Sequence, residues 1–443
     1  MATSDGTRGQ LRRAMVASTI GTSLEWYDFF LYGTVAALVF PSLFFPSASH
    51  YASVLAAFAT FAVGFVARPV GAAIFGHYGD RIGRRNTLIA TLLLMGFASI
   101  AIGLLPTAAM IGAWAGVLLV TLRVIQGIGV GGEWGGSVLL AMEWSRSGKR
   151  GFVGSWPQLG VPIGLLLSSG VVALTMRLTG DAFDTWGWRI PFLLSFLVVL
   201  IGLVIRLRVE ESPEFRRMVA RGEVRQAPVR DVLRRHPREI ALTAMMRLAE
   251  QTPFYLFTAF VLSYGTEQLG MSRNLLVAGT LVAAAIALFT VPFFGWLSDQ
   301  VGRKPLYVTG AALTFLIAIP YMWLLGTRAP AIVFLTIALS LIAHDMMYGP
   351  QAALISEAFE PSLRYSGSSL GYQFASVFAG GPAPLIAAWL LHTFDSGYAI
   401  SAYIMVSAVL TIVATLLLRE HPVADRERLG PPVRVEAGAA LAR

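Results

Sequence analysis

Long apolar stretches separated by short polar segments dominate this sequence from end to end. A bilayer core of ~30 Å requires about 20 mainly apolar residues in one helix. Twelve stretches meet that length, so we predict an all-α membrane protein with twelve transmembrane helices. The expected spans are residues 14–40, 52–76, 87–105, 112–142, 151–177, 188–208, 240–264, 274–297, 305–326, 331–355, 365–393 and 396–418.

The composition supports a membrane protein and excludes several kinds of site. Hydrophobic residues make up 56% of the chain, charged residues only 13%, and the mean hydropathy is +0.66. Soluble domains are about one quarter charged. The absence of cysteine from the sequence excludes disulfides, thiolate metal sites and cysteine nucleophiles. We also find no phosphate-binding glycine loop and no metal-ligand spacing, which disfavours an enzyme or an ATP-driven pump.

The distribution of positive charge predicts the orientation. With a cytoplasmic N-terminus, 27 of the 34 Lys and Arg residues fall on cytoplasmic segments, as the positive-inside rule requires. This placement puts both termini in the cytoplasm and explains the net charge of +9 without a nucleic-acid partner. The expected divisions are a six-helix bundle over 1–208, a linker over 209–239, a second bundle over 240–420 and a cytoplasmic tail over 421–443. The basic loop from Arg206 to Arg238 is expected to lie near anionic lipid.

Two sequence landmarks occur twice, in the same order and about half a chain apart. The pattern G-x-x-x-D-x-x-G-R-[RK] is found at residues 76–85 and again at 295–304. A Glu followed by an Arg seven positions later occurs after span 4 and again after span 10. The duplication predicts a six-helix unit present twice in parallel, as in two-half transporters.

These landmarks supply most of the residues that we expect to control opening of the halves. The motif Asp can cap a helix or pair with an Arg across the interface between the halves. Arg68, which precedes a proline, is expected to have a structural or gating role. The full set of expected gating residues is Arg68, Asp80, Arg81, Arg84, Glu143, Arg150, Asp299, Arg303, Glu357 and Arg364.

Several further segments resemble the major facilitator superfamily and, within it, the metabolite–proton symporter family. They are Glu25-Trp-Tyr-Asp28-Phe-Phe-Leu-Tyr32-Gly, Arg68-Pro-Val-Gly, Arg123-Val-Ile-Gln126-Gly, Gly131-Gly-Glu133-Trp-Gly-Gly, Gly187-Trp-Arg-Ile-Pro-Phe192 and Arg364-Tyr-Ser-Gly367. Two more, Arg247-Leu-Ala-Glu250 and Ala343-His344-Asp345-Met346, are similar to shikimate permeases. The resemblance covers nearly the whole chain.

The resemblance implies a central cavity between two bundles that opens alternately to each side. Members of that family import carboxylates such as shikimate, 2-oxoglutarate and citrate, or zwitterions such as proline and betaine. It also implies a multi-pass protein of the bacterial inner membrane that is driven by the proton gradient, needs no cofactor and functions as a monomer. We therefore expect proton-coupled import of a small organic acid, with shikimate as the leading substrate.

Ionisable residues inside apolar spans are costly and are candidates for function. Helical spacing puts Glu25, Asp28 and Tyr32 on one face of span 1, and Arg123 and Gln126 on one face of span 4. An organic anion needs a fixed cation, and the guanidinium fork stays protonated. Arg123 is our first candidate for that cation and Arg247 the second. The expected substrate-binding residues are Arg123, Gln126, Arg247, Tyr32, His344, Tyr348 and Gln351.

Proton coupling needs a carboxylate or a histidine whose protonation is tuned by its surroundings. Glu25 and Asp28 lead this set, and ion pairing of Arg123 with Glu25, Asp28 or Glu133 is the structural alternative. The expected proton-coupling residues are Glu25, Asp28, Glu133, Glu250 and Asp345, with His344 as a further candidate. A drug–proton antiporter is the main functional alternative, although it would be expected to have a more apolar cavity.

Overall fold

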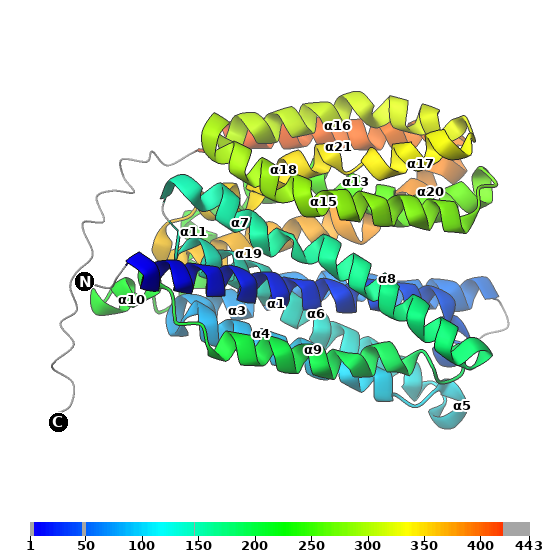
Figure 1. The fold of residues 1–443 in the computed structure, drawn as a ribbon, viewed down its shortest axis with the longest axis horizontal. Coiled ribbons are helices and arrows are strands. Elements are labelled where there is room, and N and C mark those ends of the chain that lie inside the picture. Colours follow the sequence, from blue (N-terminus) through cyan, green and yellow to red (C-terminus); the bar gives the residue numbers. More distant parts are fainter. Residues whose placement is uncertain (1–3, 47–49, 146, 420–443) are drawn as a thin grey trace.

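The computed structural model describes residues 4–46, 50–145 and 147–419, and these form helices joined by short loops (Figure 1). The predicted tail over 421–443 lies outside the described residues. Six spans make up the N-terminal half: α1 (Ser4–Leu38), α3 (His50–Ile82), α4 (Arg84–Leu104), α6 (Trp114–Met142), α7 (Arg150–Gln158) continued by α8 (Gly160–Thr179), and α9 (Arg189–Leu207). Two short helices, α2 (Phe40–Phe44) and α5 (Ala108–Ile111), connect spans at one end.

Six further spans make up the C-terminal half. They are α12 (Pro237–Met246) continued by α13 (Leu248–Tyr255), η3 (Leu256–Phe260), α14 (Val261–Ser263) and η4 (Tyr264–Gln268); α15 (Arg273–Val301); α16 (Arg303–Gly326); α17 (Pro330–Leu339) with α18 (Ile342–Ser356); α19 (Arg364–Ala375) with η6 (Ser376–Gly380) and α20 (Pro382–Phe394); and α21 (Gly397–Leu417). The prediction of an all-helical membrane protein with twelve spans is confirmed.

Among the described residues, nine helices are long and apolar enough to cross a membrane by length and composition. The other three spans are α1, α3 and the seventh span. In α1 the apolar run contains Glu25 and Asp28, α3 contains Arg68, and the seventh span alternates between α- and π-helical turns.

The two halves lie side by side, with the blue-to-green helices below and the yellow-green-to-red helices above in Figure 1. They meet along α3 with α19, α7 with α15 and α18, and α8 with α15. In each of the contacts α3–α19 and α15–α7, the second span of one half packs against the fifth span of the other half. The interface is the position at which a substrate path between the halves has to run.

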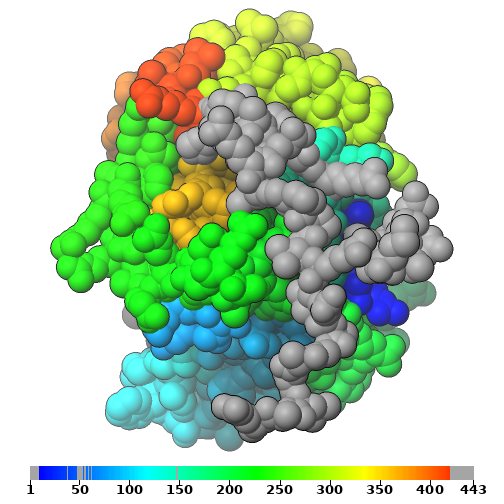
Figure 2. Space-filling view, turned by 90° about the vertical axis from the view of Figure 1, so that its left-hand side faces the viewer, coloured from blue at the N-terminus to red at the C-terminus, as the bar shows by residue number. Residues whose placement is uncertain are grey.

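The connection between the halves contains two short helices that the sequence analysis treated only as a polar linker. Ser212 caps α10 (Pro213–Ala220) by accepting a hydrogen bond from the backbone N–H of Phe215 at 3.1 Å. The second helix, α11 (Pro228–Arg235), packs against α3 and α19. Figure 2 looks onto this end of the molecule, where the green linker lies between the blue and orange helices of the two halves. We call it the linker end.

Glycines allow the closest helix approach in the N-terminal half, between α3 and α6. A Cβ atom added to Gly71 would lie 1.9 Å from the carbonyl oxygen of Ile128, and one added to Gly131 would lie 2.1 Å from that of Arg68. No side chain fits at either distance. Because the two backbones touch, the side chains of α3 and α6 next to the contact are held in one arrangement, including Arg68 and Arg123.

We expect Gly71→Ala to force α3 and α6 apart and to destabilise the protein by about 1–3 kcal/mol, the usual cost of overpacking. Thermal unfolding of the purified protein in detergent, followed by tryptophan fluorescence, measures the effect. Gly170→Ala is the matched control, because a Cβ atom at exposed Gly170 on α8 would meet nothing within 4 Å. Equal unfolding temperatures for the two variants would contradict this account of the contact.

Candidate functional site

Arg123 lies on α6 in the middle of the N-terminal half and is buried. Its guanidinium donates a hydrogen bond to the side-chain oxygen of Gln126 at 2.5 Å and lies over the ring of Tyr32, 4.1 Å from the ring centroid. Gly64 on α3 makes room for it, since a Cβ atom there would lie 2.8 Å from Nε of Arg123. The predicted sharing of one face by Arg123 and Gln126 therefore appears in the structure as a direct contact.

Asp28 on α1 is connected to Arg123 by a chain of hydrogen bonds. The hydroxyls of Ser99 on α4 and Ser195 on α9 donate to its two carboxylate oxygens at 2.6 and 2.7 Å. Ser99 in turn accepts a hydrogen bond from the side-chain amide of Gln126 at 2.8 Å. Four helices thus contribute to one buried polar network. Gln126 accepts from the Arg123 guanidinium and donates to Ser99, and Ser99 donates to the Asp28 carboxylate.

Aromatic rings from the two halves meet next to this network. The ring centroids of Trp26 and Phe254 are 6.1 Å apart, and those of Phe65 and Tyr255 are 5.7 Å apart. Phe29 also reaches Tyr255, at 6.2 Å. We call Trp26, Phe29, Phe65, Phe254 and Tyr255 the aromatic layer. It closes the centre of the interface, so that solute passing between the halves has to move these rings.

Arg68 and Glu25 lie at the edge of the aromatic layer. The Arg68 guanidinium is 4.3 Å from the ring centroid of Phe65 and 5.2 Å from that of Phe29. Glu25 interacts electrostatically with Arg68, and its Oε2 atom is buried without a hydrogen-bond partner. Arg68 therefore lies against the aromatic layer, where a change in the layer would move it.

Glu133 on α6 forms an ion pair with Arg206, the last charged residue of α9. Its carboxylate also accepts hydrogen bonds from Thr91 at 2.7 Å and Ser137 at 2.9 Å. Arg206 is only 2% exposed, although the sequence analysis counted it with the basic loop. A Cβ atom at Gly21 on α1 would collide with its guanidinium, so the pair also requires a glycine on a third helix.

The C-terminal half contains a second buried cluster, built around Glu250 on α13. Arg247 lies 3.2 Å from Oε2 of Glu250 and over the ring of Tyr372, 3.3 Å from the ring centroid. The Gln351 amide donates to the same carboxylate oxygen and to the hydroxyl of Tyr307, both at 3.0 Å. Arg247, our second candidate for a substrate-binding cation, is thus paired within its own span.

His344 on α18 completes this second cluster. Its Nε2 atom is 3.4 Å from Oε1 of Glu250, and its Nδ1 atom is 2.8 Å from Oδ1 of Asp345. The other oxygen of Asp345 accepts a hydrogen bond from Thr290 on α15. Tyr348, one turn further along α18, stacks near the imidazole at a centroid distance of 4.9 Å. Its backbone oxygen accepts a hydrogen bond from Gln158 of the other half at 3.3 Å.

At the linker end the two repeated motifs make equivalent contacts across the interface. Asp80 accepts hydrogen bonds from the backbone N–H groups of Tyr365 and Ser366, at 3.3 and 2.9 Å, at the start of α19. Asp299 accepts hydrogen bonds from the corresponding groups of Gly151 and Phe152, both at 2.8 Å, at the start of α7. Each aspartate caps a helix of the opposite half, where the helix dipole favours a negative charge.

The other expected gating residues surround these two caps. Arg84 lies 3.4 Å from both Asp80 and Glu143, Arg150 is 3.8 Å from Glu357, and Arg303 contacts Asp299 and Glu357. Arg81 is exposed and reaches Gln226 of the linker at 3.5 Å.

Glu214 of α10 joins the caps to the linker. Arg364 donates to Glu214 at 2.8 Å, and Arg150 lies 3.8 Å from it. Burial alone would raise the pKa of Glu214, but Arg364 and Arg150 hold this pKa below its usual range. The linker end is therefore closed by charged contacts that join both halves and the linker.

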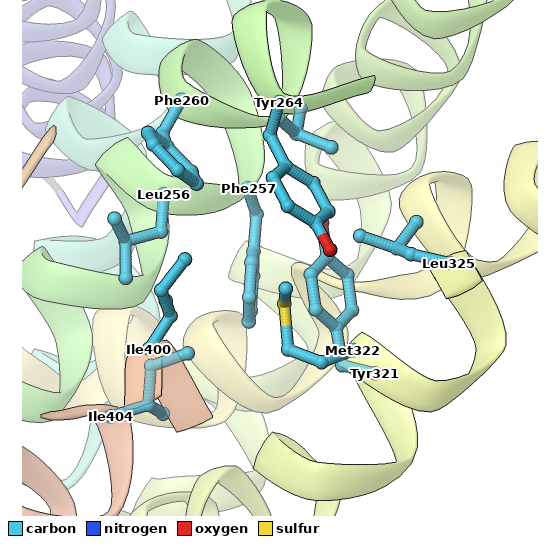
Figure 3. A pocket seen from close by; sticks show the side chains of 10 residues that line it. Leu256, Phe257, Phe260, Tyr264, Tyr321, Met322, Leu325, Ile400 and Ile404 are labelled. Carbon is cyan, nitrogen blue, oxygen red and sulfur yellow. The ribbon is translucent and has the colours of Figure 1, made fainter. Parts of the chain in front are cut away.

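A small pocket in the C-terminal half has a different character (Figure 3). Its lining comes from η3, η4, α14, α16 and α21, and its ten residues include no charged side chain. Phe257 stacks on Tyr321 there, with centroids 4.1 Å apart. This pocket offers no fixed cation for an organic anion.

Sequence reasoning missed several residues of the site. Ser99, Ser195, Thr91 and Thr290 hold the buried carboxylates, yet small hydroxyl residues are common in membrane helices and carry no special signal. Arg206 was missed because it borders a run of arginines that are exposed. Its position inside the predicted span 188–208, rather than in the loop, was the available signal.

The chain is similar to known membrane transporters over most of its length. The family profile described as Major Facilitator Superfamily matches residues 19–384. A shikimate transporter of Escherichia coli K12 is 43% identical over 92% of this chain and 94% of its own. The inner membrane metabolite transport protein YhjE of the same strain is 41% identical over the same shares. A proline/betaine transporter of E. coli K12 is 33% identical over 93% of this chain and 84% of its own.

Solved structures agree with the fold. The proton:xylose symporter XylE bound to 6-bromo-6-deoxy-D-glucose superposes with a TM-score of 0.74, covering 94% of this chain and 97% of that one. A partially occluded inward-open form of XylE from E. coli superposes with a TM-score of 0.68. Sequence identity to these two structures is 20 and 21%, so they support the architecture alone.

We expect Glu133→Gln to destabilise the protein by about 3–5 kcal/mol, because it leaves the buried Arg206 guanidinium without a carboxylate. The double variant Glu133→Gln with Arg206→Gln should recover part of that loss, since no unpaired charge remains. Unfolding temperature in detergent, monitored by size-exclusion chromatography after heating, measures both. Arg208→Gln, two residues further along and exposed, is the matched control. A single Glu133→Gln variant as stable as wild type would show that the ion pair contributes nothing.

Proposed function

This chain belongs to the Major Facilitator Superfamily, and we propose that it imports a small organic acid, shikimate or a related carboxylate, together with a proton. It is a membrane transporter and not an enzyme. The observation that carries the proposal is the position of Arg123, a buried guanidinium beside the aromatic layer with Gln126 and the Tyr32 ring as contacts. A guanidinium binds a carboxylate through two parallel hydrogen bonds and remains charged.

The ion pair of Arg247 with Glu250 makes Arg247 the weaker candidate for the substrate-binding cation. Arg206 is paired with Glu133, and Arg247 is paired with Glu250. Asp28, the carboxylate connected to Arg123, has two serine hydroxyls as donors. In the proposed complex the substrate carboxylate docks on Arg123, while Gln126 and Tyr32 contribute hydrogen bonds from the same half and Tyr348 contributes from the other.

The substrates named for the relatives share a carboxylate group, which supports a carboxylate as the part of the substrate that is recognised. Shikimate, proline and betaine each contain one carboxylate, although only shikimate carries a net negative charge. A single fixed guanidinium serves all three, and the remaining contacts distinguish them. The proposal therefore commits to the carboxylate through Arg123 and to shikimate as its first test. The alternatives are 2-oxoglutarate, citrate, a zwitterion such as proline or betaine, and drug–proton antiport.

Transport in this proposal follows alternating access across the interface between the halves. The aspartate caps and charged contacts hold the linker end closed, and the aromatic layer closes the centre. Opening of the linker end requires Asp80 and Asp299 to leave α19 and α7, after which the rings can separate. We assign the linker end to the cytoplasm, because the basic residues of the linker lie there. The protein would function as a monomer in the bacterial inner membrane, driven by the proton gradient without a cofactor.

We expect purified protein in liposomes to accumulate radiolabelled shikimate when an inward proton gradient is imposed. The accumulation should stop when the gradient is collapsed. Arg123→Gln should lower uptake at least about tenfold, and Arg123→Lys should also be impaired because a lysine lacks the bidentate fork. Arg177→Gln, at an exposed position on α8, is the control. Unlabelled 2-oxoglutarate, citrate, proline and betaine serve as competitors.

The competitors separate the possible results. Inhibition by one of them alone, more strongly than by unlabelled shikimate, would change the substrate and keep the mechanism. Normal uptake by Arg123→Gln would exclude Arg123 as the docking cation. Absence of uptake of every carboxylate by folded wild-type protein would reject organic-acid import in favour of antiport.

A further inference from the structure

The cluster around Glu250 contains more negative than positive charge when its histidine is neutral. Glu250 and Asp345 contribute two carboxylates, and Arg247 contributes one guanidinium. All three side chains are at most 5% exposed, as is His344 between the two carboxylates. A net charge buried in a helix bundle is unfavourable. One additional proton on the cluster would make it neutral.

The geometry of the imidazole indicates where that proton resides. Both ring nitrogens face carboxylate oxygens, Nδ1 that of Asp345 at 2.8 Å and Nε2 that of Glu250 at 3.4 Å. A neutral imidazole has a single N–H, so one nitrogen would direct its lone pair at an anionic oxygen. An imidazolium donates through both nitrogens and satisfies both contacts.

The remaining carboxylate oxygens already accept hydrogen bonds from other groups. Oδ2 of Asp345 accepts from Thr290, and Oε2 of Glu250 accepts from Gln351 and faces Arg247. A proton on Oε2 of Glu250 would face two obligate donors, the Gln351 amide and the Arg247 guanidinium. A proton on Oδ2 of Asp345 would require the Thr290 hydroxyl to accept it and to donate only to the backbone oxygen of Ile286, at 3.2 Å. The proton is therefore best accommodated on the ring of His344.

The buried centre of the N-terminal half has no such deficit. It contains three carboxylates and three guanidinium groups, namely Glu25, Asp28 and Glu133 with Arg68, Arg123 and Arg206. These charges cancel without any additional proton. An organic anion that docks on Arg123 adds one negative charge, which a proton in the other half can offset.

We propose that His344, held between Glu250 and Asp345, is the residue that carries the coupled proton. This inference rests on the proposed function, since it assigns the proton of that symport. The empty transporter with neutral His344 and the transporter loaded with anion and proton then have the same buried charge. Anion binding without the proton would leave two uncompensated negative charges in the centre, so passage of the anion alone is disfavoured.

His344 itself contacts Asp345 and Tyr348 on α18 and Glu250 and Phe254 on α13. Three further elements contact this cluster. Thr290 on α15 donates to Asp345, Gln351 links Glu250 to Tyr307 on α16, and Arg247, paired with Glu250, lies over the ring of Tyr372 on α19. Of these, Phe254 also belongs to the aromatic layer: its ring centroid is 5.2 Å from that of His344 and 6.1 Å from that of Trp26 in the opposite half.

This position of Phe254 suggests how proton exchange follows the movement of the halves. When the halves separate on one side, Trp26 leaves Phe254, and water can reach the imidazole. A ring nitrogen takes one proton from water on the side of high proton concentration. After the interface opens to the other side, the same nitrogen returns one proton to water, and no other bond is made or broken.

A first experiment tests the protonation of His344 without any substrate. The wild-type protein is purified in detergent with ¹⁵N-labelled histidine, and its imidazole nitrogens are followed by NMR at neutral pH. The chain contains six histidines, so His344→Gln identifies the signal by its loss. We expect a ring with both nitrogens protonated. A singly protonated His344 ring at that pH would overturn the inference whatever the protein transports.

A second experiment tests coupling in proteoliposomes, with an internal pH dye and radiolabelled shikimate. We expect His344→Gln to lower gradient-driven accumulation at least about tenfold and to abolish the proton uptake that accompanies shikimate. His392→Gln changes an exposed histidine of the same half and should behave as wild type. Asp345→Asn neutralises the cluster without a proton and should also uncouple, so it tests the inference if His344→Gln does not fold.

The results separate the inference from the function on which it rests. Wild-type accumulation of shikimate with proton uptake, unchanged in His344→Gln, would reject His344 and leave the symport proposal standing. Loss of coupling in Asp28→Asn or Glu25→Gln, with His344→Gln still coupled, would move the proton to the N-terminal half. Wild-type uptake of shikimate without proton movement would reject both the symport and the role of His344.

Discussion

The structure depends on one constraint: a charged side chain buried among apolar helices has to be matched by charge or by hydrogen bonds. Breaking a buried ion pair by removing one partner costs about 3–5 kcal/mol, so the positions of the helices around each charge are restricted. Glu133 binds Arg206, and this pair connects α6 with α9 beside a glycine of α1. Asp28 connects α1 with α4 and α9 through serines. The polar contacts thus determine how the spans of the N-terminal half are arranged.

The two repeats make equivalent contacts at the linker end, but their buried polar residues in the centre differ. At the linker end, Asp80 and Asp299 perform the same task, each capping a helix of the opposite half. In the centre, the N-terminal half contains a charge-balanced set with Arg123, whereas the C-terminal half contains a histidine between two carboxylates. The residues common to both repeats therefore close the linker end symmetrically. The buried residues that differ between the repeats form two different sites. In the functions proposed, one site takes the anion and the other the proton.

Much of the fold was predictable because the signals are local. A run of apolar residues has to form a helix in lipid, and a repeated motif has to lie at equivalent places in two similar units. The buried candidates were also found locally, since a charge in an apolar run is unusual. Their partners were not predictable: Glu25 and Asp28 share a face of α1, yet Asp28 is held by serines of α4 and α9 whereas Glu25 interacts with Arg68 of α3. Spacing along one helix says nothing about which other helix faces it.

By itself, the sequence determined the class of the protein, the number of its spans and their approximate positions, their duplication and most of the buried ionisable residues. The reason is that these properties depend on hydrophobicity and spacing along the chain. Only the tertiary structure decided which charges are paired, that Arg206 belongs to the core and not to the basic loop, and that both nitrogens of His344 face carboxylates. These facts depend on contacts between residues that are distant in sequence, and such contacts exist only once the helices have packed.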